Sequence, residues 1–214
     1  HDLRTPLTVI SGYLEGLRDG SLKPTQSRFD TLFQESQLLK RLIDDLRTLS
    51  LADAGELNLV YQEVHPRDLL EQVIVSFTPL AESQKVDFKI AIDDDLPVIQ
   101  VDRDRMLQVL GNLVSNSLRF TPEGGTISLA GRAEDNQLIL TVKDTGSGIA
   151  NEHLQNIFAR FYRASESRQQ QHSESGLGLA IAKSIVTAHH GQIMADSVVG
   201  QGTTITIYLP YTPM

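Results

Sequence analysis

The sequence predicts an α+β protein in which a helical hairpin is followed by a two-layer α/β sandwich. The first 54 residues show helical periodicity and no convincing strand pattern, and the rest of the chain interleaves helical and strand patterns. Between them lies a short stretch that has the character of a linker. We therefore expect a hairpin domain over 1–54, a linker over 55–62 and a second domain over 63–214.

The hairpin is predicted from two amphipathic stretches joined by a turn. In the first stretch, five apolar residues share one helical face: Leu3, Leu7, Ile10, Leu14 and Leu17. The turn falls at 19–25, where Asp-Gly is followed by Ser and Pro. The second stretch begins at about Thr25 and spaces its apolar residues three and four apart, as in coiled coils. Because a lone hairpin cannot cover such faces, we expect a two-fold homodimer whose hairpins form a four-helix bundle.

The second domain is predicted from helix and strand patterns that alternate along the chain. Helices are expected over 66–84, 103–120, 152–161 and 177–191. Strands are expected over 86–92, 98–102, 126–132, 137–144, 192–198 and 203–210. The polar sequence Ala-Glu-Asp-Asn joins two of these strands, and Gly191 ends the last helix. Such a mixture forms a two-layer sandwich.

The overall composition excludes several classes of protein. Of the 214 residues, 40% are hydrophobic, which is enough for a packed core. The net charge of −8 argues against non-specific nucleic-acid binding, which needs a basic surface. There is no cysteine, so a disulfide framework and a thiolate metal site are excluded. No apolar run reaches the ~18–20 residues of a membrane span. Since no start methionine is present, we expect a piece of a longer protein.

One polar face in the second domain is a candidate for nucleotide binding. Asn112, Asn116 and Arg119 share one side of the helix expected over 103–120, opposite its apolar side. Amide oxygens suit magnesium, and a guanidinium suits phosphate. Taken alone, however, Asn-x-x-x-Asn is more often an ordinary solvated face.

Two glycine-containing turns extend this pattern. Asp144 ends a strand and is followed by Gly146 and Gly148, so a carboxylate stands where the backbone can approach a ligand closely. Gly176 and Gly178 precede a helix, whose free N–H groups and dipole favour phosphate. Each turn is weak alone, as a common turn or a flexible hinge. No P-loop sequence competes with this interpretation.

In their order along the chain, these motifs and Phe-Ala-Arg-Phe-Tyr-Arg (158–163) resemble a known ATP-binding domain. Histidine kinases, gyrase-type topoisomerases, mismatch-repair ATPases and Hsp90 chaperones share that domain. The first residues, His-Asp-Leu-Arg-Thr-Pro-Leu, resemble the phosphoacceptor box of sensor histidine kinases, usually written His-Glu-Leu-Arg-Thr-Pro-Leu. The resemblance to two-component sensor kinases covers essentially the whole chain.

The resemblance implies an ATP-dependent protein-histidine kinase with ATP and Mg²⁺ as cofactors. His1 would accept the γ-phosphoryl group, Asp2 (in place of the usual Glu) would act as the base, and Thr5 would help to dephosphorylate the partner. Asn116 is the implied magnesium ligand, with Asn112 beside it. The residues implied to bind ATP are Asn112, Asn116, Arg119, Phe120, Asp144, Gly146, Gly148, Arg160, Arg163, Gly176, Leu177, Gly178 and Thr203.

Within this set, Asp144 is implied to accept a hydrogen bond from the adenine amino group, and Phe120 to pack on the base. Residues 165–175 are implied to form a mobile lid. His189 and His190 near a helix end are interpreted as helix-terminal residues rather than metal ligands.

The resemblance also implies partners and a location. The chain would dimerise through its hairpin, pass the phosphoryl group to the receiver domain of a response regulator, and form the cytoplasmic part of a membrane-anchored sensor. Val9, Gly12 and Tyr13 are hypothesised to dock the regulator, with Gly16 near the same face, although the glycines could simply soften the helix. Two alternatives stay open: a catalytically inactive dimeric scaffold (pseudokinase) that binds a response regulator, and an ATPase that drives conformational change.

Overall fold

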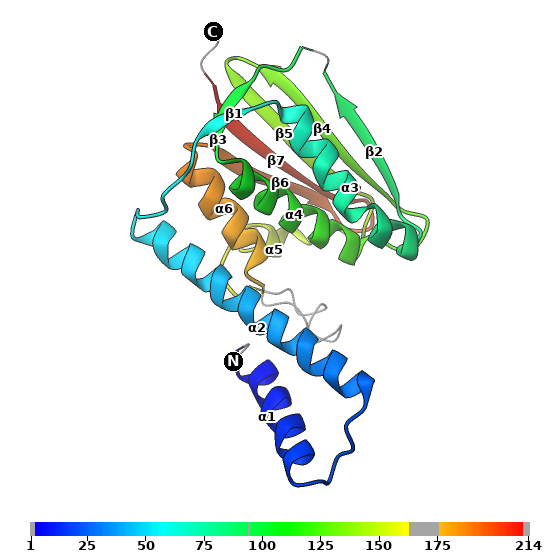
Figure 1. Ribbon diagram of the computed structural model, residues 1–214. Coiled ribbons are helices and arrows are strands. Elements are labelled where there is room, and N and C mark those ends of the chain that lie inside the picture. The colour runs from blue at the N-terminus through cyan, green and yellow to red at the C-terminus, as the bar shows by residue number, and fades with distance from the viewer. Residues whose placement is uncertain (1–2, 94, 163–175, 212–214) are drawn as a thin grey trace.

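The computed structural model describes residues 3–93, 95–162 and 176–211 and shows a helical hairpin joined to a two-layer domain (Figure 1). Helices α1 (Arg4–Arg18) and α2 (Gln26–Asp53) form the hairpin. In the second domain, a layer of helices covers one face of a sheet (Figure 1). This arrangement confirms the predicted fold class.

The elements of the second domain follow one another in the order expected. The helices are α3 (Pro66–Gln84), α4 (Arg103–Phe120), α5 (Asn151–Leu154) and α6 (Gly178–Ala188). The strands are β1 (Gln62–Val64), β2 (Asp87–Ile92), β3 (Ile99–Val101), β4 (Thr126–Glu134), β5 (Gln137–Asp144), β6 (Gln192–Val198) and β7 (Gly202–Pro210). The short strand β1, which pairs antiparallel with β3, has no counterpart in the sequence-based expectation.

The main sheet has five strands in the order β2-β4-β5-β7-β6. Only β2 and β4 are parallel, and the other neighbours are antiparallel. The tight turn between β4 and β5 uses Asp135 and Asn136, whose φ angles of 49° and 61° suit a type I′ hairpin. The core between sheet and helices is built from fully buried apolar side chains, including Leu70, Met106, Leu110, Ile127, Leu129, Leu140, Ile181 and Ile207.

The expected helix over 152–161 is wrong beyond Leu154, where helix α5 ends. Turns replace it, and Phe161 adopts a left-handed φ of 58° that no helix can continue through. The backbone N–H of Phe161 donates instead to the carbonyl of Gly176, at 3.1 Å. A backbone contact with a residue later in the chain thus replaces the helix that the local apolar spacing predicted.

The apolar side chains of the hairpin stay largely exposed in the single chain. Leu7 and Leu14 on α1 are each 53% exposed, and Phe33 on α2 is 66% exposed. Gly16 has a different role, since a β-carbon there would lie 2.7 Å from the side chain of Leu22 in the connecting turn. Gly12, by contrast, faces open space. The hairpin therefore presents an uncovered apolar surface.

The C-terminal half of α2 packs against the second domain. Leu49 is 1% exposed and belongs to the same core as the sheet and its helices. Nearby, the hydroxyl of Thr48 accepts a hydrogen bond from Nη1 of Arg105 at 3.3 Å. Figure 1 shows this part of α2 lying beside α6. Within the described residues, no helix is both long and apolar enough to cross a membrane.

His189 is the C-cap residue of α6 and is almost fully buried. Its Nδ1–H donates to the carbonyl of Ile185 at 2.9 Å, and its Nε2 accepts from the backbone N–H of Asp102 at 3.0 Å. These bonds require the neutral ring, and burial lowers the pKa of His189 below its ordinary value. The carboxylate of Asp102 accepts from the N–H groups of Val60 and Arg105. The imidazole therefore connects α6, α4 and the linker.

Replacing His189 by leucine is expected to lower the free energy of unfolding at pH 7.5 by about 1–3 kcal/mol, because the buried N–H of Asp102 loses its acceptor. The pH dependence should also flatten. Since the folded pKa lies below the unfolded one, the unfolded chain takes up this proton first, and the native protein loses stability as the pH falls below about 6.5. Denaturant unfolding at pH 7.5 and pH 5.5 measures both effects.

The exposed neighbour provides the control. His190→Asn should keep most of the native pH dependence, because burial and not His190 is the main cause of the lowered pKa of His189. Asparagine also tolerates the left-handed φ of 59° at this position. If the leucine variant lost as much stability on acidification as the native chain, the role given to His189 would be refuted.

Candidate functional site

The carboxylate of Asp144, at the end of β5, is the centre of a polar cluster. Its side chain is buried, with the residue 5% exposed. Oδ1 accepts from the backbone N–H groups of Gly146 and Thr203, at 2.9 and 3.1 Å. Oδ2 accepts from the hydroxyl of Ser117 at 3.2 Å. Because a carboxylate offers about four acceptor positions, one position on Oδ2 is left for a further donor.

The turn after Asp144 is enclosed by its neighbours. A β-carbon on Gly146 would lie 2.5 Å from the carbonyl oxygen of Phe120. Gly148 has a φ of 70°, and a β-carbon there would lie 2.1 Å from the carbonyl oxygen of Val198. Both glycines are therefore required by packing. The sequence also predicts that a ligand approaches this turn closely, which would require glycine at the same positions.

Thr203 and Ser197 form a second polar pair beside Asp144. The hydroxyls of Thr203 and Ser197 lie 3.0 Å apart, and Thr203 is 8% exposed. The Ser197 hydroxyl donates to the carbonyl of Gly202 and accepts from the N–H of Ile149. The structure thus places the predicted Thr203 next to Asp144. Sequence reasoning missed Ser117 and Ser197. The one signal for Ser117 was its position as a hydroxyl residue on the otherwise largely apolar side of α4.

The beginning of α6 lies against the polar face of α4. Nδ2 of Asn112 donates to the carbonyl of Gly178 at 3.1 Å. A β-carbon on Gly178 would be only 3.7 Å from the Asn112 side chain. Leu177, the N-cap residue of α6, is buried and provides no side-chain cap. The first N–H groups of α6 therefore lack a capping side chain beside Asn112, and such a helix start favours an anion.

Asn116, Arg119 and Phe120 follow on the same helix. Asn116 is partly exposed one turn beyond Asn112. The guanidinium of Arg119 lies 5.2 Å from the centre of the Phe120 ring, a cation–π arrangement. Gly176, which follows residues 163–175 in the sequence, has a φ of 65° and lies against Tyr162 and Phe161.

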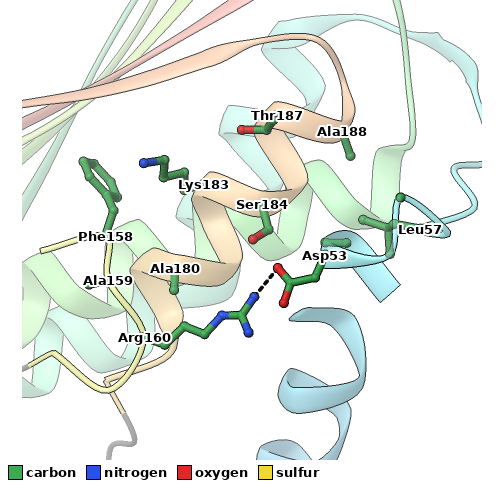
Figure 2. A pocket seen from close by; sticks show the side chains of 12 residues that line it. Asp53, Leu57, Phe158, Ala159, Arg160, Ala180, Lys183, Ser184, Thr187 and Ala188 are labelled. Atoms are coloured by element: carbon green, nitrogen blue, oxygen red, sulfur yellow. Dashed lines mark hydrogen bonds and ion pairs between the residues drawn. The ribbon is translucent and has the colours of Figure 1, made fainter. Parts of the chain in front are cut away.

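Arg160 contacts the hairpin helix α2. It pairs with Asp53 at the end of α2, and this hydrogen bond raises the pKa of Arg160 and lowers the pKa of Asp53. Figure 2 shows the pair at the edge of a cavity of about 540 Å³ between α2 and α6. Lys183 and Phe158 also line that cavity. Of the predicted ATP-binding residues that the structure describes, Arg160 lines this cavity.

Several predicted residues fall outside the described part of the chain: His1, Asp2, Arg163 and the loop 165–175. Thr5 is exposed in the first turn of α1. Among the described residues, no cluster of three or more His, Cys, Asp or Glu side chains could hold a metal ion. The magnesium prediction therefore concerns the amide oxygens of Asn112 and Asn116.

Comparison with known proteins decides the family. The family described as "Histidine kinase-, DNA gyrase B-, and HSP90-like ATPase" matches residues 101–213, more than half of the chain. The family described as "His Kinase A (phospho-acceptor) domain" matches residues 1–55. The chain belongs to the sensor histidine kinases. The family predicted from the sequence is therefore confirmed.

Individual relatives agree with this assignment. Sensor histidine kinase WalK of Bacillus subtilis is 39% identical over 99% of this chain, which spans only 35% of the length of WalK. The histidine kinase AdeS of Acinetobacter baumannii has a TM-score of 0.84 at 29% identity, covering 100% of this chain and 98% of AdeS. ShkA, solved at full length in complex with AMPPNP, has a TM-score of 0.77 at 28% identity, covering 100% of this chain and 45% of ShkA.

In this histidine kinase, a β-carbon at Gly146 is expected to disrupt the site. Gly146→Ala should weaken ADP binding at least about tenfold, because the new methyl must displace the carbonyl of Phe120 or the turn that holds Asp144. Gly111→Ala is the matched control on α4. Its β-carbon would lie 3.7 Å from Phe77, an ordinary contact, so ADP affinity should persist and stability should rise by up to about 1 kcal/mol.

Titration calorimetry with ADP and thermal unfolding of both variants provide the measurements. Native ADP affinity in the Gly146 variant would show that the turn does not need glycine at this position.

Proposed function

We propose that this chain binds ATP, phosphorylates itself on His1 and passes the phosphoryl group to an aspartate of a response regulator. One observation carries the proposal: the buried carboxylate of Asp144 bonds to Ser117 on α4 and keeps an open acceptor position, and Asn112 on the same helix borders the uncapped start of α6. A base and a phosphate chain would meet complementary groups at the two ends of this arrangement.

Asp144 would accept the hydrogen bond of the adenine amino group, and Phe120 would pack on the base. The first N–H groups of α6, from Leu177 onward, would hold phosphate oxygens. Asn116 and Asn112 would hold Mg²⁺ through their amide oxygens. The donor set fits a hard cation, because the amide nitrogen of Asn112 is already bonded to the carbonyl of Gly178 and its oxygen stays available. Bound Mg²⁺ would neutralise charge on the phosphates.

The phosphoryl transfer itself would use the first residues of the chain. A ring nitrogen of His1 forms a bond to the γ-phosphorus while the bond from that phosphorus to the ADP oxygen breaks. The imidazole then carries a positive charge until one proton leaves. Asp2 orients the ring through its other nitrogen and accepts that proton. The groups on α4 and α6 act by position and charge.

The remaining parts of the proposal concern partners and location. The exposed side chains of Leu7, Leu14 and Phe33 support a homodimer formed by the hairpin. Open space at Gly12 suits a docking regulator, and exposed Thr5 suits a role in removing the phosphoryl group from it. We place the hairpin domain at 1–54, the linker at 55–62 and the ATP-binding domain at 63–214. Because the chain spans about a third of WalK, we propose that it is the cytoplasmic part of a membrane-anchored sensor.

Autophosphorylation is tested by incubation with γ-labelled ATP and Mg²⁺. The protein should acquire label that is stable to alkali and labile to acid, as a phosphoramidate is. His1→Ala should acquire no label and should still bind ADP, because none of the residues proposed to bind the nucleotide lies in the hairpin. Label that survives the His1 substitution would falsify the proposed acceptor. Intact ADP binding without any label on the native chain would favour the pseudokinase scaffold.

Dimerisation is tested by the mass of the chain in solution. The native chain should sediment at twice its 23.7 kDa, and Phe33→Asp should shift it to the monomer by placing a charge in an apolar interface. Val75→Asp is the matched control, since Val75 is 73% exposed on α3 and far along the chain from the hairpin. A native monomer, or a Phe33→Asp dimer, would contradict the proposed interface.

A further inference from the structure

The hydroxyl of Ser117 behaves differently from other hydroxyls on the described helices. Several threonines and serines donate to the carbonyl four residues earlier, as is usual in helices: Thr31, Thr48, Ser76, Thr78 and Thr121. Ser117 is 4% exposed and donates across the fold to Oδ2 of Asp144, at 3.2 Å. Its hydroxyl therefore serves the carboxylate rather than its own helix.

The position of that hydrogen bond matters for the carboxylate. Oδ1 of Asp144 is already held by the two backbone N–H groups of Gly146 and Thr203. Those bonds restrain one oxygen and leave the other free to swing. The Ser117 hydroxyl restrains that second oxygen from the side of α4, which aims its remaining acceptor position in one direction.

Three hydroxyl protons near the carboxylate, those of Ser117, Ser197 and Thr203, are committed to protein acceptors. Ser117 has a single proton, which goes to Asp144. Ser197 also has a single proton, which goes to the carbonyl of Gly202, so the contact between Ser197 and Thr203 uses the proton of Thr203. The polar wall that these three hydroxyls form therefore offers lone pairs and no free proton. Such a wall suits an amino group and repels a carbonyl oxygen.

We propose that Ser117 is a positioning residue that orients Asp144 for a purine carrying a 6-amino group. Together with the commitment of the Thr203 proton, it makes the site select adenine over 6-oxo purines. This inference rests on the proposed ATP binding. It adds that Ser117 contributes to base recognition indirectly, by orienting Asp144.

The test measures the dissociation constants of ADP and inosine diphosphate, which differ at position 6, on the full chain. The native protein should prefer ADP. Ser117→Ala should weaken ADP binding on the order of tenfold, as expected when a hydrogen bond to a charged group is lost. Binding of inosine diphosphate should change less than twofold, because its 6-oxo group gains nothing from an oriented Asp144. The preference for ADP should thus fall several-fold.

Three variants separate this role from a structural one. Ser117→Thr keeps the hydroxyl and should keep the preference. Ser117→Cys fills the same space with a weaker donor and should reduce the preference as alanine does, which also serves if the alanine variant does not fold. Thr121→Val removes a neighbouring buried hydroxyl that donates to the carbonyl of Ser117, and it should leave the preference unchanged.

Each outcome decides between the two proposals. Equal weakening of both nucleotides by Ser117→Ala and Ser117→Cys would overturn the inference and leave ATP binding intact. A native chain that binds neither nucleotide would overturn the proposed function, and the inference with it.

Discussion

The buried carboxylate of Asp144 is the interaction on which the nucleotide domain depends. An unpaired carboxylate in such a place would be strongly unfavourable, so its three donors must come together when the chain folds. They come from the turn after β5, from β7 and from α4. The glycines follow from the same constraint, since a β-carbon on Gly202 would lie 2.0 Å from the carbonyl oxygen of Asp144. The residues that permit the fold here are thus the residues that shape the site.

The hairpin is held to this domain by contacts of different strength. Leu49 lies in the shared core, and the linker residue Val60 bonds to the buried Asp102 carboxylate. The ion pair of Asp53 and Arg160 is solvent-exposed, with side chains 57% and 41% exposed, and such pairs add little stability. Movement of the hairpin relative to the ATP-binding domain would therefore break the ion pair easily. Displacing this end of α2, by contrast, would expose the buried side chain of Leu49.

The sequence predicts those parts of the fold that repeat locally. Helix α4 and the strands β4 and β5 carry clear periods of 3.6 and 2, and their predicted bounds match the structure to within two residues. Features that depend on distant contacts left no such signal. The helix expected to reach residue 161 fails because Phe161 bonds to Gly176. Ser117 is unremarkable in the sequence until the fold brings Asp144 to it, and Arg160 likewise meets Asp53 only through tertiary packing.

Helix α4 explains why one short element can serve both ends of a nucleotide. Asn112 bonds to the start of α6, where we propose that phosphate binds, and Ser117 bonds to Asp144, where we propose that the base binds. Five residues separate them, which corresponds to about 7.5 Å along a helix axis. Since α4 is rigid and its apolar side is buried, this separation cannot change without disturbing the core. The distance between the proposed base and phosphate positions is therefore set by helix geometry.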